Sequence, residues 1–189
     1  MFQRLIAGAV GALIIITGAL AGEDKPLTED QAKRFVATLA AVEALGDQLR
    51  DDGKIENLQI AQQPIAGEPF KPYSTAVTIL KEKHPGDHAK LANTVEEHGF
   101  STTEWGSVGD RVMVAYLAVK MQEEDPRSLE MMEGMDKSMM DMVPPEMRAQ
   151  LESTFAMMET VKNAPEADKM AVMAVKDDLD NYMEKDAAS

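Results

Sequence analysis

The densest group of chemically distinctive side chains is a run of methionines, MMEGMDKSMMDM, between residues 131 and 142. At about 100° per residue in a helix, five of its six methionines fall within one arc: Met131, Met132, Met135, Met139 and Met142. The charged residues of the run point the other way, so the predicted helix is amphipathic. Methionine is unbranched and polarizable, and a face rich in it can adapt to partners of different shapes. The run therefore predicts a surface that binds a protein or peptide partner.

Two other interpretations of these methionines remain open. Thioether sulfur is a soft ligand that favours Cu(I), and pairs three or four residues apart on a helix can reach one ion. Met132, Met135 and Met139 have this spacing, and Met170 and Met173 could add to the site. Alternatively, the stripe is the buried side of a helix in which methionine takes the place of leucine. That is the ordinary explanation of an amphipathic helix, but it leaves the choice of methionine unexplained, because leucine specifies a core better.

A second candidate site is the sequence HPGDH, in which His84, Asp87 and His88 stand close enough to share a zinc ion. The ordinary explanation is a solvated turn in which Asp87 caps the next helix. His98 lies nearly three turns further on and cannot join the set. The many acids are spread over helix faces, and the sequence GSVGD lies inside a predicted helix, where it cannot cradle a phosphate. We therefore expect a protein that binds a partner and is not an enzyme.

Helices must position these residues, because apolar side chains recur every three or four positions and strand-like alternation is absent from the sequence. Capping boxes open two of the helices, at residues 28–31 and 101–104. The second of these helices carries Trp105 and is the predicted centre of the fold, with Gly109 where another helix can approach closely. The full pattern predicts helices over residues 28–51, 74–83, 87–98, 101–121, 126–143, 145–162 and 165–182. The fold class is thus all-α, a multi-helix bundle of about seven helices.

Composition changes near residue 125. The tryptophan, two of three tyrosines and four of five phenylalanines precede this point, whereas most methionines follow it. We expect one domain over residues 22–189, with an aromatic-cored part at 22–124 and a methionine-rich, three-helix part at 125–189. This length is enough for one core of ordinary size.

The first residues have the form of a secretory signal. Arg4 precedes an uncharged stretch from Leu5 to Gly22, and Ala19 and Ala21 occupy the two small-residue places of a cleavage site. We expect residues 1–21 to be a signal peptide that is removed, leaving a periplasmic or secreted protein. The alternative is an uncleaved membrane anchor, since about 18 apolar residues can also span a bilayer.

The chain is strongly acidic, with 33 acidic against 19 basic residues and a formal charge of −14. Removal of residues 1–21 takes away one arginine and no acid, which leaves −15. Such a chain is repelled by nucleic acid and by anionic lipid, so we expect neither as a partner. The chain contains no cysteine, so packing without disulfides must hold the exported fold together.

Two resemblances can be stated on particular residues. The stretches LTEDQAKRFVATLAAVEALG and HGFSTTEWGSVGDRVMVAYLAVKM resemble an uncharacterised group of small, exported, helical proteins of proteobacteria, a likeness that implies no activity. Leu27, Thr28 and Gln31 are similar to the LTxxQ element of the periplasmic Spy family of helical chaperones. That family carries the element twice and this chain once, and a capping box also explains the single copy. The likeness implies chaperone-like binding and assigns no client site.

Overall fold

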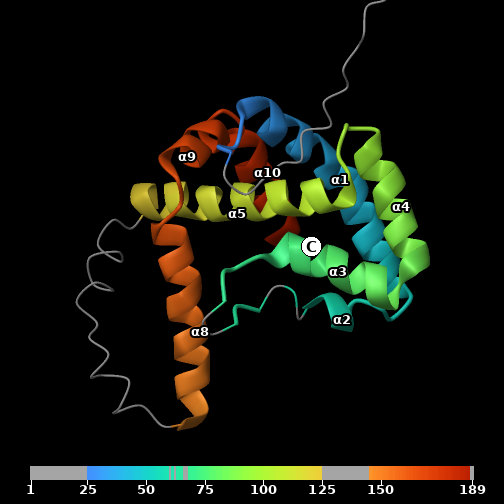
Figure 1. The fold of residues 1–189 in the computed structure, drawn as a ribbon, viewed down its shortest axis with the longest axis horizontal. Coiled ribbons are helices and arrows are strands. Elements are labelled where there is room, and N and C mark those ends of the chain that lie inside the picture. Colours follow the sequence, from blue (N-terminus) through green and yellow to red (C-terminus); the bar gives the residue numbers. More distant parts are fainter. Residues whose placement is uncertain (1–24, 60, 62, 66–67, 125–144, 188–189) are drawn as a thin grey trace, which may run out of the picture.

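The computed structural model describes residues 25–59, 61, 63–65, 68–124 and 145–187. Within these residues every regular element is a helix and none is a strand, so the predicted all-α fold is confirmed (Figure 1). The described helices are α1 (Glu29–Asp51), α2 (Glu56–Gln59), α3 (Pro72–Lys83), α4 (Pro85–Glu96), α5 (Thr102–Glu124), α8 (Pro145–Lys162), α9 (Glu166–Met173) and α10 (Lys176–Ala187). The short α2 lies between the predicted helices at 28–51 and 74–83, where the sequence predicted no helix. The predicted helix at 126–143 lies outside the described residues.

Two of the predicted helix starts, at Thr28 and Ser101, are present in the structure. The backbone N–H of Gln31 donates to the Thr28 hydroxyl at 3.2 Å, and the Gln31 side chain accepts from the Thr28 N–H at 3.1 Å. The N–H of Glu104 donates to the Ser101 hydroxyl at 3.2 Å in the same way. These bonds satisfy amides that a helix start otherwise leaves without a partner. After α1, Gly53 has φ 70°, a left-handed conformation that glycine adopts without steric cost.

Helix α5 runs through the middle of the molecule, as predicted, with α1, α3, α4 and α9 packed around it (Figure 1). Trp105 is buried, and its indole N–H donates to the buried Thr38 hydroxyl of α1 at 2.8 Å. The rings of Phe35, Tyr73 and Trp105 have their centroids 5.2 to 5.5 Å apart. Edge and tilted contacts of this kind add to the stabilisation from burial. One aromatic cluster thus joins α1, α3 and α5.

Gly109 is the point of closest approach in this cluster. A Cβ built on it would lie 2.7 Å from ring atoms of both Phe35 and Tyr73. The prediction that another helix comes close at this glycine is therefore confirmed, and two helices, α1 and α3, do so.

Asp110 explains how α3 begins without a cap of its own. Lys71 stands at the cap position and makes no side-chain capping bond. Instead, the buried Asp110 carboxylate on α5 accepts from the N–H of Tyr73 at 2.7 Å and from the N–H of Ser74 at 3.3 Å. Burial raises the pKa of Asp110 above its ordinary value, and the hydrogen bonds oppose this. The acid at the end of GSVGD thus has a structural role.

The prediction of one helix over residues 165–182 is wrong. Helix α9 ends at Met173 and α10 starts at Lys176, with a turn between them in which the N–H of Val175 donates to the carbonyl of Val172 at 2.9 Å. The turn lets α9 pack on α5 while α10 reaches α1. There, Lys185 Nζ lies 3.6 Å from Glu43 Oε2. Packing thus overrides a sequence pattern that a single helix could satisfy.

The C-terminal helices share the core of the N-terminal ones. Ala171, Val172, Val175 and Leu179 are buried in the same cluster as Phe35 and the other aromatic residues. A second, smaller cluster joins α5 to the end of α8 through Val114, Ala118, Val161 and Ala164. In the described residues, α9 and α10 therefore pack directly on the aromatic-cored part of the fold. Among the described helices, α8 is the one that extends away from the body (Figure 1).

Candidate functional site

The five methionines of the predicted partner-binding stripe, Met131, Met132, Met135, Met139 and Met142, lie outside the described residues. The same holds for the predicted Cu(I) ligands, Met132, Met135 and Met139. The placement of the other methionines nevertheless bears on why this chain uses methionine at all.

No methionine with a described side chain belongs to the core. Of eight such residues, three are exposed and five are half-buried: Met113, Met121, Met147, Met157, Met158, Met170, Met173 and Met183. By contrast, seven of the ten leucines with described side chains are buried. If methionine simply replaced leucine, the two would share the core. In the described part of the chain, leucine fills the interior and methionine lies at or near the surface.

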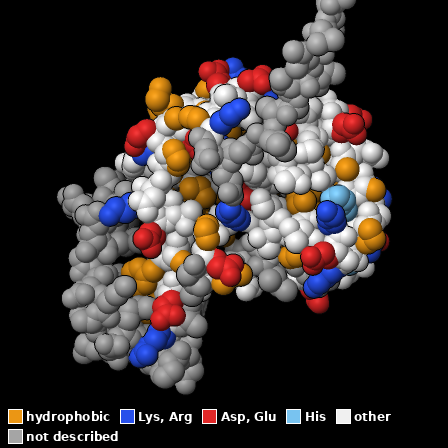
Figure 2. Space-filling model, in the orientation of Figure 1, with side chains coloured by type: hydrophobic (Ala, Val, Ile, Leu, Met, Phe, Trp, Pro, Cys, Tyr) orange, Lys and Arg blue, Asp and Glu red, His pale blue; other side chains and the backbone are white. Residues whose placement is uncertain are grey.

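Three of the described methionines have more than half of their surface exposed to solvent. Met147 is 56% exposed, Met170 71% and Met173 61%, and the only other large apolar side chain exposed among the described residues is Ile65 at 52%. Met170 and Met173 are three residues apart on α9 and so share a face. Figure 2 shows hydrophobic side chains on the surface over α9, with acidic ones close by. These two residues were predicted as additions to the methionine site, and the structure places both in solvent.

Helix α9 is held firmly beneath this exposed pair. Its Asp168 is buried and accepts from Arg111 of α5 in two hydrogen bonds, from Nε at 2.8 Å and from Nη2 at 2.6 Å. The same carboxylate accepts from the N–H of Leu27 at 2.9 Å, and Arg111 also donates to the carbonyl of Lys25. Val172 is fully buried on the inner side of α9. Met170 and Met173 are thus flexible side chains on a fixed backbone.

Acidic residues flank the exposed pair along the chain. Glu166 precedes Met170 by four residues on the same face, and its side chain is 84% exposed. Asp177 and Asp178, in the first turn of α10, are exposed and make no ion pair within the described residues. Asp177 follows Met173 by four residues, so the two Cα atoms lie within about 14 Å even for an extended chain. The methionines therefore lie in a negatively charged setting.

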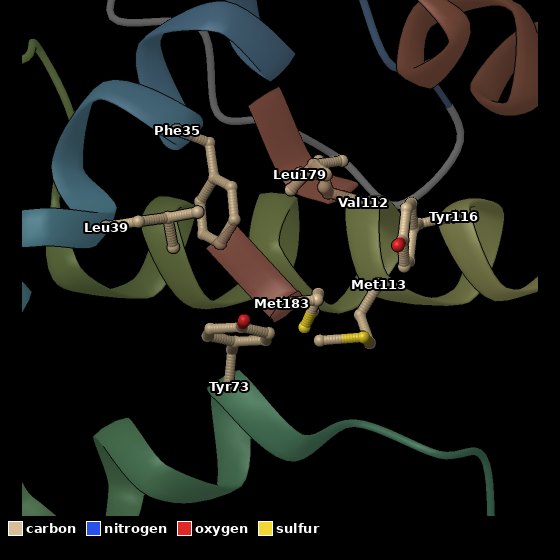
Figure 3. A pocket seen from close by; sticks show the side chains of 8 residues that line it. All are labelled: Phe35, Leu39, Tyr73, Val112, Met113, Tyr116, Leu179 and Met183. Carbon is tan, nitrogen blue, oxygen red and sulfur yellow. The ribbon is translucent and has the colours of Figure 1, made fainter. Parts of the chain in front are cut away.

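Two further methionines meet at a small hollow between α1, α3, α5 and α10 (Figure 3). It has a volume of about 10 Å³, and Met113 and Met183 line it together with Tyr73 and Tyr116. The Tyr116 hydroxyl donates to Asp180 at 2.7 Å at its side. A volume of that size holds about one water molecule. The hollow is therefore a small gap in the packing that flexible thioethers border, and it is too small to hold an organic ligand.

The histidine turn does not assemble the predicted zinc site. Asp87 is buried and accepts from Lys54 at 3.0 Å and from Lys90 at 2.9 Å, and these hydrogen bonds lower its pKa below the ordinary value. No group of three or more acidic or histidine side chains in the described part of the chain could hold a metal ion. The role of Asp87 as a helix cap was also wrong, because α4 begins at Pro85 with His84 at the cap position. Asp87 instead joins α4 to Lys54, just after α1.

No protein-family model, curated protein or solved structure matches this chain. Among the described helices, none is both long and apolar enough to cross a membrane. The function must therefore be argued from the placement of the residues themselves.

Proposed function

We propose that this chain is an exported, non-enzymatic protein that binds a protein or peptide partner, in a chaperone-like manner, through methionine-bearing helix surfaces. The observation that carries the proposal is the partition of apolar residues. Among the described side chains, leucine is mostly buried and methionine is not, and the full chain has 15 methionines. Apolar side chains exposed together on a surface either mark an interaction site or lower the solubility of the protein.

The chemistry of methionine explains the choice. Its three side-chain torsions and polarizable sulfur let one surface contact partners of different shapes, whereas a leucine surface has fewer rotamers to offer. The described exposed methionines all follow the predicted stripe along the chain. Met147 follows Met142 by five residues, and Met170 and Met173 lie on a helix fixed to the body. In this proposal the stripe and these residues serve the same binding activity.

The proposal is tested by suppression of aggregation. The purified exported chain is mixed with reduced α-lactalbumin, a protein that aggregates when its disulfides are broken, and light scattering is followed. We expect the chain to delay the rise in scattering. A variant with Gln at Met131, Met132, Met135, Met139 and Met142 should lose most of the delay, because the amide lowers apolarity at nearly constant length.

A matched variant with Leu at the same five positions separates flexibility from apolarity, and the proposal expects a weaker but measurable delay. Thermal unfolding, followed by circular dichroism, tests the remaining interpretation, in which the stripe is the buried side of a helix. If the Gln variant melts far below the parent chain, these side chains belong to a core and the proposal fails. If it melts normally and delays aggregation fully, the proposal also fails.

Cu(I) handling is the second candidate function, and the observation that favours it is the solvent exposure of Met170 and Met173 at a spacing that can share an ion. Titration with Cu(I) against a competing chelator tests it. We expect retention to fall when Met132, Met135 and Met139 become Leu, and to fall further when Met170 and Met173 do. Equal retention by the parent chain and the five-fold variant excludes thioether handling of copper.

A further inference from the structure

The exposed surface of α9 and the start of α10 combines apolar and acidic groups in a way that specifies a class of partner. We define the α9–α10 face as Glu166, Met170, Met173, Asp177 and Asp178. Its two methionines are the most exposed large apolar residues in the described part of the chain. Its three acids are exposed and lie within a few residues of them.

The apolar centre of the face is fixed in position. Ala171 and Val172 of α9 are buried in the main core, and Asp168 is held by Arg111. A partner that docks here pays little to order the backbone beneath it, because only methionine side chains must settle.

Two of the three acids of the face make no ion pair within the described residues. Glu166 pairs with Lys169, but Asp177 and Asp178 have no ion pair within the described residues. The chain as a whole carries 33 acidic against 19 basic residues, so its long-range field also favours cations. Anionic partners, such as nucleic acid or anionic lipid surfaces, would be repelled at this face.

We propose that the α9–α10 face binds a basic, amphipathic helical segment of a protein or peptide. Leucine-like side chains of that segment pack on Met170 and Met173, and its lysine or arginine side chains meet Asp177, Asp178 and Glu166. An amphipathic helix offers an apolar stripe with a charged border, which is the complement of this face. The inference rests on the proposed partner-binding function and names the partner class for one part of it.

The test uses three synthetic, fluorescein-labelled peptides of about 14 residues, or about four helical turns. One is a leucine–lysine amphipathic helix, one has the same composition in scrambled order, and one has glutamate in place of lysine. Fluorescence anisotropy measures their binding to the full chain. We expect the first to bind with a Kd of about 1 to 100 μM, as befits a small interface. The other two should bind at least about tenfold more weakly.

Salt and variants locate the site. Raising the salt from about 0.01 M to about 0.1 M shortens the Debye length from about 30 Å to about 10 Å and should weaken binding several-fold. The variant M170Q/M173Q should lose at least about tenfold in affinity, because both thioether side chains lose their apolar contact with the peptide. D177N/D178N should lose about two- to tenfold and most of the salt dependence.

Two matched variants serve as controls, and both should keep the parent affinity. E96Q/E97Q removes an adjacent pair of exposed acids at the end of α4, on the opposite side of the body in Figure 1. I65Q removes an exposed large apolar side chain in the segment between α2 and α3. If either control weakens binding as much as the α9–α10 variants do, the site assignment is overturned.

The outcomes also distinguish a failure of this inference from a failure of the proposed partner-binding function. Equal binding of the lysine and glutamate peptides refutes the basic partner class, and equal binding of the scrambled peptide refutes the helical one. If no peptide binds but the chain still suppresses aggregation of reduced α-lactalbumin, only the present inference fails. If both assays are negative, the proposed function fails with it.

Discussion

Arg111 and Asp168 form a two-pronged ion pair between α5 and α9, with the Asp168 side chain only 2% exposed. The carboxylate also accepts the N–H of Leu27. Three parts of the chain far apart in sequence, residues 25–27, α5 and α9, thus meet at one buried charge. Removal of one partner leaves the other charge buried without compensation, which is far more costly than loss of a surface pair.

We therefore predict that Arg111→Leu lowers the free energy of unfolding by about 3 to 5 kcal/mol, measured by urea denaturation. The control is Lys33→Gln, which removes an ion pair with Glu29 in which both side chains are 58% exposed. Such surface pairs contribute about 0 to 1 kcal/mol. Similar losses in the two variants would contradict the structural importance of the buried pair.

The same contact predicts how the N-terminal segment responds to truncation. Leu27 is buried, and the carbonyl of Lys25 accepts from Arg111, so residues 25–27 are part of the fold. A chain that starts at Lys25 should unfold at the same urea concentration as one that starts at Gly22. A chain that starts at Thr28 loses the Leu27 side chain and two hydrogen bonds, and its unfolding midpoint should fall clearly. An equal midpoint for all three chains would mean that the contacts of residues 25–27 with Arg111 and Asp168 do not stabilise the fold.

Thr28 and Asp168 show which kinds of contact a sequence can predict and which it cannot. The capping box at Thr28 is local, since both partners lie three residues apart, and it was predicted correctly. Asp168 and Arg111 are 57 residues apart, and each stands in a sequence that reads as an ordinary charged helix surface. No periodicity reveals such a pair, because it depends on how the helices fold back on one another.

The candidate site shows the same limit. The spacing of Met170 and Met173 was recognisable in the sequence, but such a pair occurs both on the buried side of a helix and on a partner-binding surface. Which side of α9 faces inward is decided by Val172 and Asp168 together, and a buried aspartate cannot be foreseen without its arginine. The break between α9 and α10 was missed for a related reason, because Val172, Val175 and Leu179 fit one face of a continuous helix.

The close approach at Gly109 gives a prediction with an internal control. Gly109→Ala puts a Cβ 2.7 Å from the rings of Phe35 and Tyr73, so it should destabilise the fold by about 1 to 3 kcal/mol. Gly46→Ala, inside α1, meets no atom within 4 Å and should stabilise it by roughly 0.5 to 1 kcal/mol. Thermal unfolding of both variants checks the two signs. A neutral Gly109→Ala would mean that α1 and α3 do not pack this closely on α5.

Tyr116 and Asp180 predict how stability depends on pH. Burial and the hydrogen bond to Asp180 raise the pKa of Tyr116 from 10.0 to about 12, and bonds from Lys176 and Tyr116 lower the pKa of Asp180 from 3.8 to about 2. The phenol therefore contributes stability below pH 10 that is lost as the pH rises to about 12. The carboxylate contributes stability above pH 3.8 that is lost as the pH falls to about 2.

Unfolding of Tyr116→Phe, measured across the pH range, tests this relation. The variant cannot ionise at residue 116, so its stability should fall less steeply than that of the parent chain between pH 10 and 12. Its acid-induced loss should be smaller and should end at a higher pH, because Asp180 has lost one hydrogen-bond donor and its pKa in the folded chain is lowered less. Parallel curves for the two chains at both extremes would exclude the pair as a source of the pH dependence.

Oxidation by dilute hydrogen peroxide, followed by peptide mass spectrometry, should order the methionines by exposure. Peroxide reaches exposed thioethers first, so Met170, Met173 and Met147 should become sulfoxides before the half-buried Met113 and Met183. The proposed function adds a stronger expectation, that Met131, Met132, Met135, Met139 and Met142 react as fast as the exposed group. A saturating amount of the leucine–lysine peptide should slow oxidation of Met170 and Met173 several-fold and leave Met147 unchanged. If the stripe reacts as slowly as Met113, its sulfur atoms are shielded, and partner binding must then be sought on α9 alone.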